Sequence, residues 1–583
     1  MRMSEELLKI RKNLLEDGFI LGLDETDTLS KLRRERNRIK ETMDAQKKGH
    51  ESLCGDPNRH RQRMMLWSGI PFPEKQIPAI NLNSHGRHLV VSVGGTNTYF
   101  MVMELKDGEI IAFEKGKPHQ EEKIEILQKK NRMATPHSES AQDTGKEKMI
   151  NPIVAAIYPH LTHTAHQCKS IILNWAYSQT VKQDGAGFFD ISTTTRIEKG
   201  QEGFSDLMGA KVEDVFRDAI AEKIESELKT LEEFDESTVF QMGIHLLGKG
   251  EVDTSAKDSD IKNRKECRKK HLENLLDDIL SKKKPKITVA NDTIMALHYF
   301  LTGENLQTYD QIGLFVNGTG ANFTIAENYL VDDDGRMVYK HGSLNEINQR
   351  PLEANRQNAQ KFFINYEAGV LELRETKTIY DTEQTDQMER NALSGASFGK
   401  SFKEIVCRNL SIAVYEMIVS SREGKKIPMG ENAPYRELTP EPEAIDIAQL
   451  SSCGLTSLEQ RKILLGKVNF EPVIIEKLIV IADAIIERSA LHAALVLSAI
   501  TERTGYGLKE PCERKKFGLD VTKGDALCLE GSIWKIEGYQ EKVRKFWQKL
   551  VGLELNIDFL HEPDYNASLY GPIYMAAVHG KLR

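Results

Sequence analysis

The stretch 287–322 places the strongest constraint on how this chain folds. Residues 287–290 form a short apolar run rich in β-branched side chains, which predicts a buried strand. Asn291, Asp292 and Thr293 come next, and these residue types commonly begin helices. Apolar residues then recur at helical spacing. The pattern therefore predicts a strand followed directly by a helix, with the carboxylate of Asp292 on the first helical turn.

The same stretch predicts a glycine turn after a second strand. The helix is expected to stop at Gly303, and a strand over 312–316 leads into Gly318-Thr319-Gly320. In open α/β sheets, ligands bind beyond the carboxyl ends of the strands. The backbone amides of the turn and the hydroxyl of Thr319 can cradle a phosphate there. Each feature also has a structural explanation, because Asp commonly caps helices and glycine commonly closes hairpins.

A second glycine turn lies in the N-terminal half. Residues 89–105 read as a hydrophobic hairpin whose turn is Gly94-Gly95-Thr96-Asn97. Backbone without Cβ atoms can approach a phosphate closely, and Thr96 and Asn97 add side-chain hydrogen bonds. Most turns of this kind only close a hairpin. The motif alone therefore does not distinguish a phosphate site from a simple hairpin turn, and the elements that follow it must decide.

Length and composition indicate a soluble enzyme with more than one domain. The 583 residues are too many for one core, and the length suggests roughly three to four domain-sized units. Lysine and arginine number 79 and aspartate and glutamate 87, a formal net charge of −8, so nucleic acid is not an expected partner. The basic stretch 31–50 is expected to be a solvated helical face. No run approaches the ~18 apolar residues of a membrane span.

The remaining composition favours a cytoplasmic protein. The chain begins with an amphipathic helix and not with a secretion signal. Its seven cysteines include no CxxC pair, which argues against a disulfide framework. His160, His163, His166 and Cys168 are metal-ligand types, but positions three apart on a helix drift by about 60° around its axis. That drift spoils a tetrahedral site, so we expect no zinc there.

The other expected elements follow from the same patterns. Helices are predicted over 1–50, 153–168 and within the charged stretch 225–285, and a strand over 171–173. Residues 51–85 contain four prolines and read as a connector, and 107–151 as a polar insertion.

The order of these elements resembles that of the hexokinase family, sugar kinases with the actin-like ATPase fold. The glycine hairpin, the strand–Asn-Asp-Thr helix and the Gly-Thr-Gly turn occur in the family's order. Four further segments are similar to family motifs, again in order: 363–369 (Ile-Asn-x-Glu-x-Gly), 388–395 (Phe-Glu-Lys with Ser-Gly), 487–490 (Arg-Ser-Ala) and 529–535 (Val-Asp-Gly-Ser-x-Tyr-Lys).

The resemblance spans residues 86–583 and implies an α/β fold of two lobes, ribonuclease H-like, around a cleft. It implies a small domain of residues 86–290 with 568–583 and a large domain of residues 291–567. Residues 1–85, the N-terminal helices and connector, are expected to pack on the large domain.

The resemblance also implies an activity: ATP-dependent phosphorylation of a glucose-like hexose at its terminal hydroxyl, with Mg²⁺. Asp292 matches the family's general base. The residues at sugar-binding positions are Asn174, Lys199, Asn291, Asn322, Glu367 and Glu389. Those expected to hold the nucleotide are Gly94, Gly95, Thr96, Asn97, Gly318, Thr319, Gly320, Gly531 and Ser532. The implied partners are a hexose and a nucleotide.

The chain departs from the family pattern where the nucleotide and the sugar are handled. Ser92 stands where the family has an aspartate, and Tyr99 where it often has an arginine; both positions usually serve the Mg–nucleotide. Asn174-Trp175-Ala176 replaces Ser-Phe-Pro, and Lys199 is the nearest substitute for a Thr-Lys sugar contact.

Two other functions stay open. The departures favour a hexokinase-like sugar sensor or regulator with weak or no turnover. An actin- or chaperone-like ATPase acting on proteins is a further alternative. Glu367 and Glu389 argue against it, since those folds need no pair of carboxylates that grips a sugar.

Overall fold

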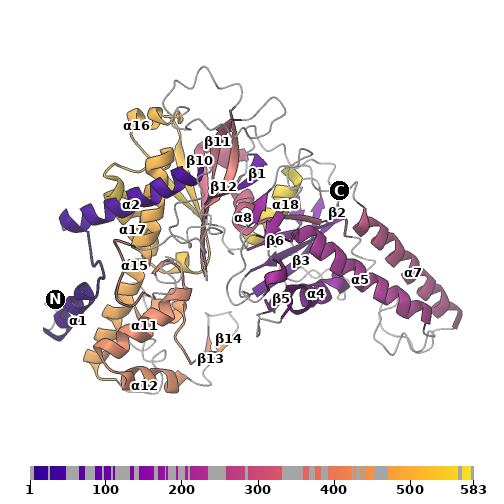
Figure 1. Ribbon diagram of the computed structural model, residues 1–583, viewed down its shortest axis with the longest axis horizontal. Coiled ribbons are helices and arrows are strands. Elements are labelled where there is room, and N and C mark those ends of the chain that lie inside the picture. Colours follow the sequence, from indigo (N-terminus) through magenta and orange to yellow (C-terminus); the bar gives the residue numbers. More distant parts are fainter. Residues whose placement is uncertain are drawn as a thin grey trace.

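The structure is a computed structural model. It describes residues 5–23, 26–47, 65–71, 86–94, 97–106, 109–111, 131–136, 143–162, 168–176, 179–181, 192–194, 204–207, 210–233, 258–281, 287–301, 303–318, 320–330, 359–366, 374–381, 392–422, 426–428, 435–437, 440–451, 470–561 and 567–578. Two six-stranded sheets, with helices packed against them, organise these residues into two lobes (Figure 1). The α/β class expected from the sequence is confirmed.

The small-lobe sheet consists of β2 (Gly86–Val93), β3 (Asn97–Lys106), β4 (Glu109–Ile111), β5 (Asn131–Ala134), β6 (Ser170–Trp175) and β9 (Ile287–Asn291). Its order is β4-β3-β2-β6-β9, with β5 paired to β3. β2 and β3 form the expected hairpin, and β2, β6 and β9 run parallel. β6 and β9 are buried along their whole length, because helices cover both faces of the sheet. This explains their continuous apolar sequences.

The large-lobe sheet consists of β1 (Met65–Pro71), β10 (Tyr309–Asn317), β11 (Ala321–Leu330), β12 (Ala359–Tyr366), β15 (Gly524–Glu530) and β16 (Ile557–His561). The order is β1-β12-β11-β10-β15-β16. β10 and β15 are parallel neighbours, and Val316 lies opposite Glu530. The turns that follow these two strands therefore lie side by side.

The outer face of the small-lobe sheet is covered by α4 (Asn151–Thr162), α5 (Val212–Glu233) and α7 (Asp258–Leu280). α5 and α7 pack against each other and extend together beyond the sheet (Figure 1). A buried ion pair joins them, because Arg268 donates to both carboxylate oxygens of Glu227, at 2.8 and 3.1 Å. Within the charged stretch 225–285, the described residues 225–233 and 258–280 are helical, as predicted.

The long helix α15 (Pro472–Thr504) organises the outer side of the large lobe. It packs against α17 (Tyr539–Val551), α11 (Ala396–Asn409), α1 (Glu5–Glu16) and α2 (Thr26–Lys47). Arg36 on α2 donates to the carbonyl of Leu550 on α17 at 2.8 Å. The N-terminal helices are thus built into the large-lobe core.

Two helices form a layer between the sheets: α8 (Asp292–Phe300) and α18 (Ala567–Val578) (Figure 1). They pack on each other, and one apolar cluster joins them to both sheets. A Cβ atom on Gly571 would lie 2.0 Å from the carbonyl oxygen of Met295, so glycine is required where the helices touch. α8, which starts at Asp292, is therefore fixed to both lobes.

The other elements are short. They are η3 (Lys146–Ile150), η4 (Ser205–Leu207), η8 (Ile533–Lys535), α9 (Gly303–Thr308), α12 (Ile412–Arg422), α13 (Ala444–Leu450), α16 (Pro511–Lys516) and the strand pairs β7 (Gln179–Val181) with β8 (Ser192–Thr194) and β13 (Lys426–Pro428) with β14 (Tyr435–Glu437). Among the residues that the structure describes, no helix is both long and apolar enough to span a membrane.

Several local predictions differ from the structure. The stretch 107–151, read as an insertion, contributes β4 and β5 to the small-lobe sheet, and the helix expected over 153–168 is α4, which ends at Thr162. The N-terminal helical stretch is two helices, since α1 ends at Glu16 and Gly18 takes a φ of +98°. The connector contributes β1 to the large-lobe sheet, paired with β12. Gly303 begins α9 instead of ending α8, which already stops at Phe300.

Candidate active site

The step from β9 to α8 has the predicted form. β9 ends at Asn291, and Asp292 is the first residue of α8. The side chain of Asn291 caps the helix by accepting from the amide of Thr293 at 3.0 Å. Asp292 Oδ1 accepts from the same amide at 2.7 Å and from the Thr293 hydroxyl at 3.0 Å. These bonds hold the half-buried carboxylate at the N-terminus of the helix.

The buried polar groups beside Asp292 are only partly satisfied. Asn291 pairs with Trp175 across the parallel strands, so Asn174 lies at the same carboxyl end of the sheet, on β6. The side-chain nitrogen of Asn291 and the side-chain oxygen of Asn174 are buried, and neither has a hydrogen-bond partner in the described part of the chain. A buried donor and a buried acceptor near a carboxylate are the groups that a polar ligand such as a sugar needs.

Asn174 also connects β6 to β2 and to α18. Its amide nitrogen donates to Ser92 Oγ at 3.2 Å and to the carbonyl of Ser568 at 2.7 Å. Ser92 is only 9% exposed. The uncharged hydroxyl of Ser92 is therefore hydrogen-bonded within the protein.

The first glycine turn closes the β2–β3 hairpin. The amide of Gly94 donates to the carbonyl of Asn97 at 3.0 Å, and the hydroxyl of Thr135 donates to the carbonyl of Gly94 at 2.6 Å. Arg132 donates to the side-chain oxygen of Asn97 at 2.8 Å. Arg132 on β5 and Thr135, directly after β5, thus support this turn, and Arg132 brings a positive charge to it.

The second glycine turn connects β10 to β11. The amide of Gly318 donates to the carbonyl of Gly320 at 2.9 Å, and the carbonyl of Gly318 accepts from the amide of Gly395 at 2.7 Å. Gly531, after β15, has a φ of +106°, and a Cβ atom there would lie 2.3 Å from the carbonyl oxygen of Asn317. A Cβ on Gly318 would approach Ser532 N at 3.9 Å.

The structure therefore brings Gly318, Gly531 and Ser532 together and adds Gly395, which was not among the predicted site residues. We call Gly318, Gly395 and Gly531 the glycine cradle. Its members come from three separate segments, so the sequence does not show that Gly395 joins the other two. The only sequence signal for Gly395 is its place in the family-like segment 388–395. Backbone this close and this free of side chains suits a phosphate-bearing ligand.

Asn322 occupies the start of β11, half-buried and opposite Val316 of β10. Its neighbour Phe323 pairs with Tyr366, the last residue of β12. α8 packs against β10, β11 and β12, the strands that lead to these positions. The helix that begins with Asp292 therefore contacts the strands that carry the second glycine turn and Asn322.

Several predicted residues lie outside the described part of the chain, and their roles stay predictions: Gly95, Thr96, Lys199, Thr319, Glu367 and Glu389. Of the histidine cluster, His160 is buried against the ring of Phe100, and Cys168 Sγ lies 3.7 Å from the carbonyl of His160. His163 and His166 are not described. Within the described ranges, no group of three or more His, Cys, Asp or Glu side chains could hold a metal ion.

Two solved hexokinase structures are similar to this chain along its length. For the hexokinase from Schistosoma mansoni complexed with glucose, the TM-score is 0.52 at 13% sequence identity, covering 99% of this chain and 100% of that chain. For a second hexokinase crystal structure, the TM-score is 0.54, with the same identity and coverage. No protein-family model and no curated protein sequence matches. The chain therefore has the two-lobed, actin-like α/β fold of hexokinases, as its motifs predicted.

Proposed function

We propose that this protein is an ATP-dependent sugar kinase that phosphorylates the terminal hydroxyl of a glucose-like hexose. One observation carries the proposal: Asp292 is fixed at the start of α8, next to the buried and unsatisfied polar atoms of Asn291 and Asn174. The fold shared with hexokinases, one of them complexed with glucose, supports the same substrate class.

In the proposed reaction, Asp292 is the general base. The hexose hydroxyl oxygen forms a bond to the γ-phosphorus of ATP, the bond from that phosphorus to the bridging oxygen breaks, and ADP leaves. The hydroxyl proton passes to the Asp292 carboxylate. Asn291 and Asn174 would bind neighbouring hydroxyls, because an amide supplies both a donor and an acceptor. Asn322, Glu367, Glu389 and Lys199 are proposed to complete the sugar site.

The glycine cradle, with Gly320, Thr319 and Ser532, is the proposed nucleotide site of the large lobe. Gly94, Gly95, Thr96 and Asn97 would approach the phosphates from the small lobe. Mg²⁺ bound with ATP would neutralise phosphate charge. The hydroxyl of Ser92 carries no charge, so the nucleotide phosphates themselves would contribute most of the binding of Mg²⁺.

The test is Asp292→Asn, which keeps the shape of the side chain and the cap of α8. Loss of a general base typically lowers turnover about 10²–10⁴-fold. We expect that loss in kcat, with sugar affinity changed little, because binding does not need the proton acceptor. A variant that keeps more than about a tenth of wild-type turnover would exclude Asp292 as the base.

A second function is favoured by Ser92. Its hydroxyl accepts from Asn174 and leaves the position of the family's aspartate without charge. A protein that binds the sugar but transfers phosphate slowly or not at all would act as a sensor or regulator. Sugar binding without ADP release for any hexose would establish this alternative.

A further inference from the structure

Three buried polar side chains adjoin the glycine cradle. Asn317, which precedes Gly318, donates its amide to the hydroxyl of Tyr539 at 3.2 Å and to the carbonyl of Leu393 at 3.4 Å. The hydroxyl of Ser489 donates to the same carbonyl at 2.6 Å and lies 2.9 Å from the hydroxyl of Tyr539. Asn317, Ser489 and Tyr539 have no exposed surface. We call them the Asn317–Ser489–Tyr539 cluster.

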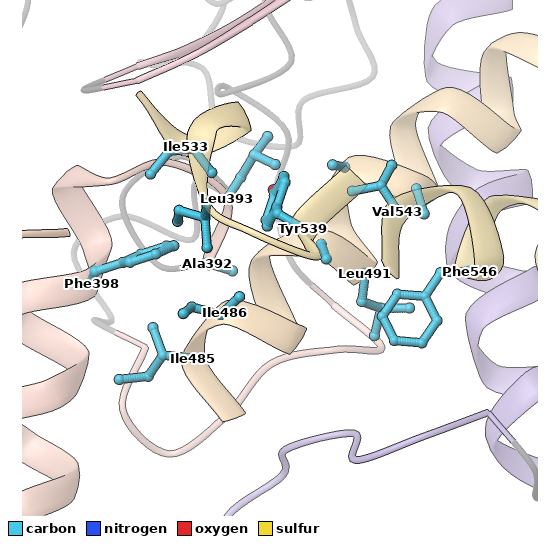
Figure 2. Packing of buried hydrophobic residues seen from close by; sticks show 14 of the residues in the cluster. Ala392, Leu393, Phe398, Ile485, Ile486, Leu491, Ile533, Tyr539, Val543 and Phe546 are labelled. Carbon is cyan, nitrogen blue, oxygen red and sulfur yellow. The ribbon is translucent and has the colours of Figure 1, made fainter. Parts of the chain in front are cut away.

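The cluster joins elements that are far apart in the sequence. Asn317 ends β10, Ser489 lies inside α15 and Tyr539 begins α17. Figure 2 shows Tyr539 between Leu393 and Val543, within an apolar core. Burial raises the pKa of Tyr539 above its ordinary value, so the hydroxyl stays protonated and able to donate. Each hydrogen bond lost in such surroundings leaves a costly unsatisfied group, so the bonds of the cluster favour one geometry; among the described residues only the side-chain oxygen of Asn317 in this cluster has no partner.

The contacts of the cluster lead to both sides of the cradle. Asn317 is covalently joined to Gly318. Leu393, which accepts from Asn317 and Ser489, lies two residues before Gly395, and the amide of Gly395 donates to Gly318. The backbone of Asn317 is also the surface against which Gly531 packs. Displacement of the Tyr539 hydroxyl would therefore move all three cradle glycines relative to one another.

We propose that Tyr539 and Ser489 are positioning residues for the nucleotide: the buried cluster holds the cradle in the geometry that binds the phosphates of ATP. The proposal rests on the proposed function, which assigns the nucleotide to the cradle. Neither side chain touches the ligand. They act through Asn317 and Leu393. A cradle backbone that is already ordered lowers the entropy cost of nucleotide binding.

The test is Tyr539→Phe, which removes one oxygen and keeps the ring in the core. Binding of the ATP analogue AMP-PNP with Mg²⁺ is measured by calorimetry, well below the unfolding temperature. We expect roughly three- to tenfold weaker binding, the range that corresponds to one net buried hydrogen bond. Ser489→Ala removes the second hydroxyl and is also expected to weaken the binding of AMP-PNP. It also serves as the test if Tyr539→Phe does not fold.

Tyr506→Phe is the matched control. Tyr506 is also fully buried in the large-lobe core, and its hydroxyl donates to the carbonyl of Ala526 at 2.6 Å, away from the cradle. This variant should lose stability and bind AMP-PNP as the wild type does. The inference is overturned if Tyr539→Phe and Ser489→Ala bind like the wild type, or if Tyr506→Phe weakens binding equally. A wild type that binds no AMP-PNP would instead refute the proposed nucleotide site, and this role with it.

Discussion

Ser92→Asp restores a charge at the position where the hexokinase family has an aspartate. Ser92 lies on β2 with 9% of its surface exposed, and the amide of Asn174 donates to its hydroxyl. The same amide can donate to a carboxylate, so the site offers the new charge one hydrogen bond. Burial of the carboxylate with a single donor should lower stability by about 1–3 kcal/mol.

The effect on Mg²⁺ follows from Coulomb's law. A carboxylate about 6 Å from a hydrated divalent ion contributes about 1.4 kcal/mol even at the dielectric constant of bulk water, ~80. That energy corresponds to about a tenfold lower half-saturating Mg²⁺ concentration. We therefore expect a high Mg²⁺ requirement in the wild type, and a lower requirement with faster turnover in Ser92→Asp.

The assay is ADP release at saturating sugar and nucleotide across a Mg²⁺ titration. Ser92→Asn is the control, because it changes the size of the side chain without adding charge and should leave the Mg²⁺ requirement high. An active Ser92→Asp enzyme with unchanged Mg²⁺ dependence would show that another acid serves the ion. If wild type and variant are both inactive with every sugar, the sensor function becomes the better explanation.

Two further predictions concern the small lobe. Binding of the sugar should close the lobes, because the proposed contacts divide between Asn174 on one lobe and Asn322 and Glu367 on the other. The radius of gyration from solution scattering should therefore fall when glucose is added. An unchanged radius at saturating sugar counts against closure. Burial and the charge of Lys169 lower the pKa of His88 to about 4 from 6.5, so about 3 kcal/mol of the free energy of unfolding is fully present above pH 6.5 and is lost as the pH falls toward 4. The free energy of unfolding, measured from pH 7 to pH 4, should therefore depend less on pH in His88→Gln than in the wild type. Equal slopes would refute this assignment.

The parts of the fold that the sequence predicted are those with local signals. The boundary between β9 and α8 follows from β-branched residues next to Asn291 and Asp292, and both side chains accept from the amide of the nearby Thr293. The glycine turns are likewise specified by the residues that form them. These elements need no distant contact to be recognised.

The parts that escaped prediction depend on distant contacts. β1 pairs with β12, about 300 residues later, and its proline-bearing surroundings favoured a connector. Of the Asn317–Ser489–Tyr539 cluster, only Ser489 lies in a family-like segment, 487–490, and nothing in the sequence connects it with Asn317 or Tyr539. The fold brings Asn317 and Ser489 to the carbonyl of Leu393, and the hydroxyl of Tyr539 to both of their side chains.

The most direct test of sugar phosphorylation is a coupled ADP-release assay of the wild-type protein across a panel of hexoses. Each sugar is supplied with Mg–ATP, and a reaction without sugar gives the background. We expect ADP release that depends on the sugar, highest for glucose or a close relative, with one phosphate appearing on the sugar per ADP. ADP release equal to the background for every hexose would contradict it.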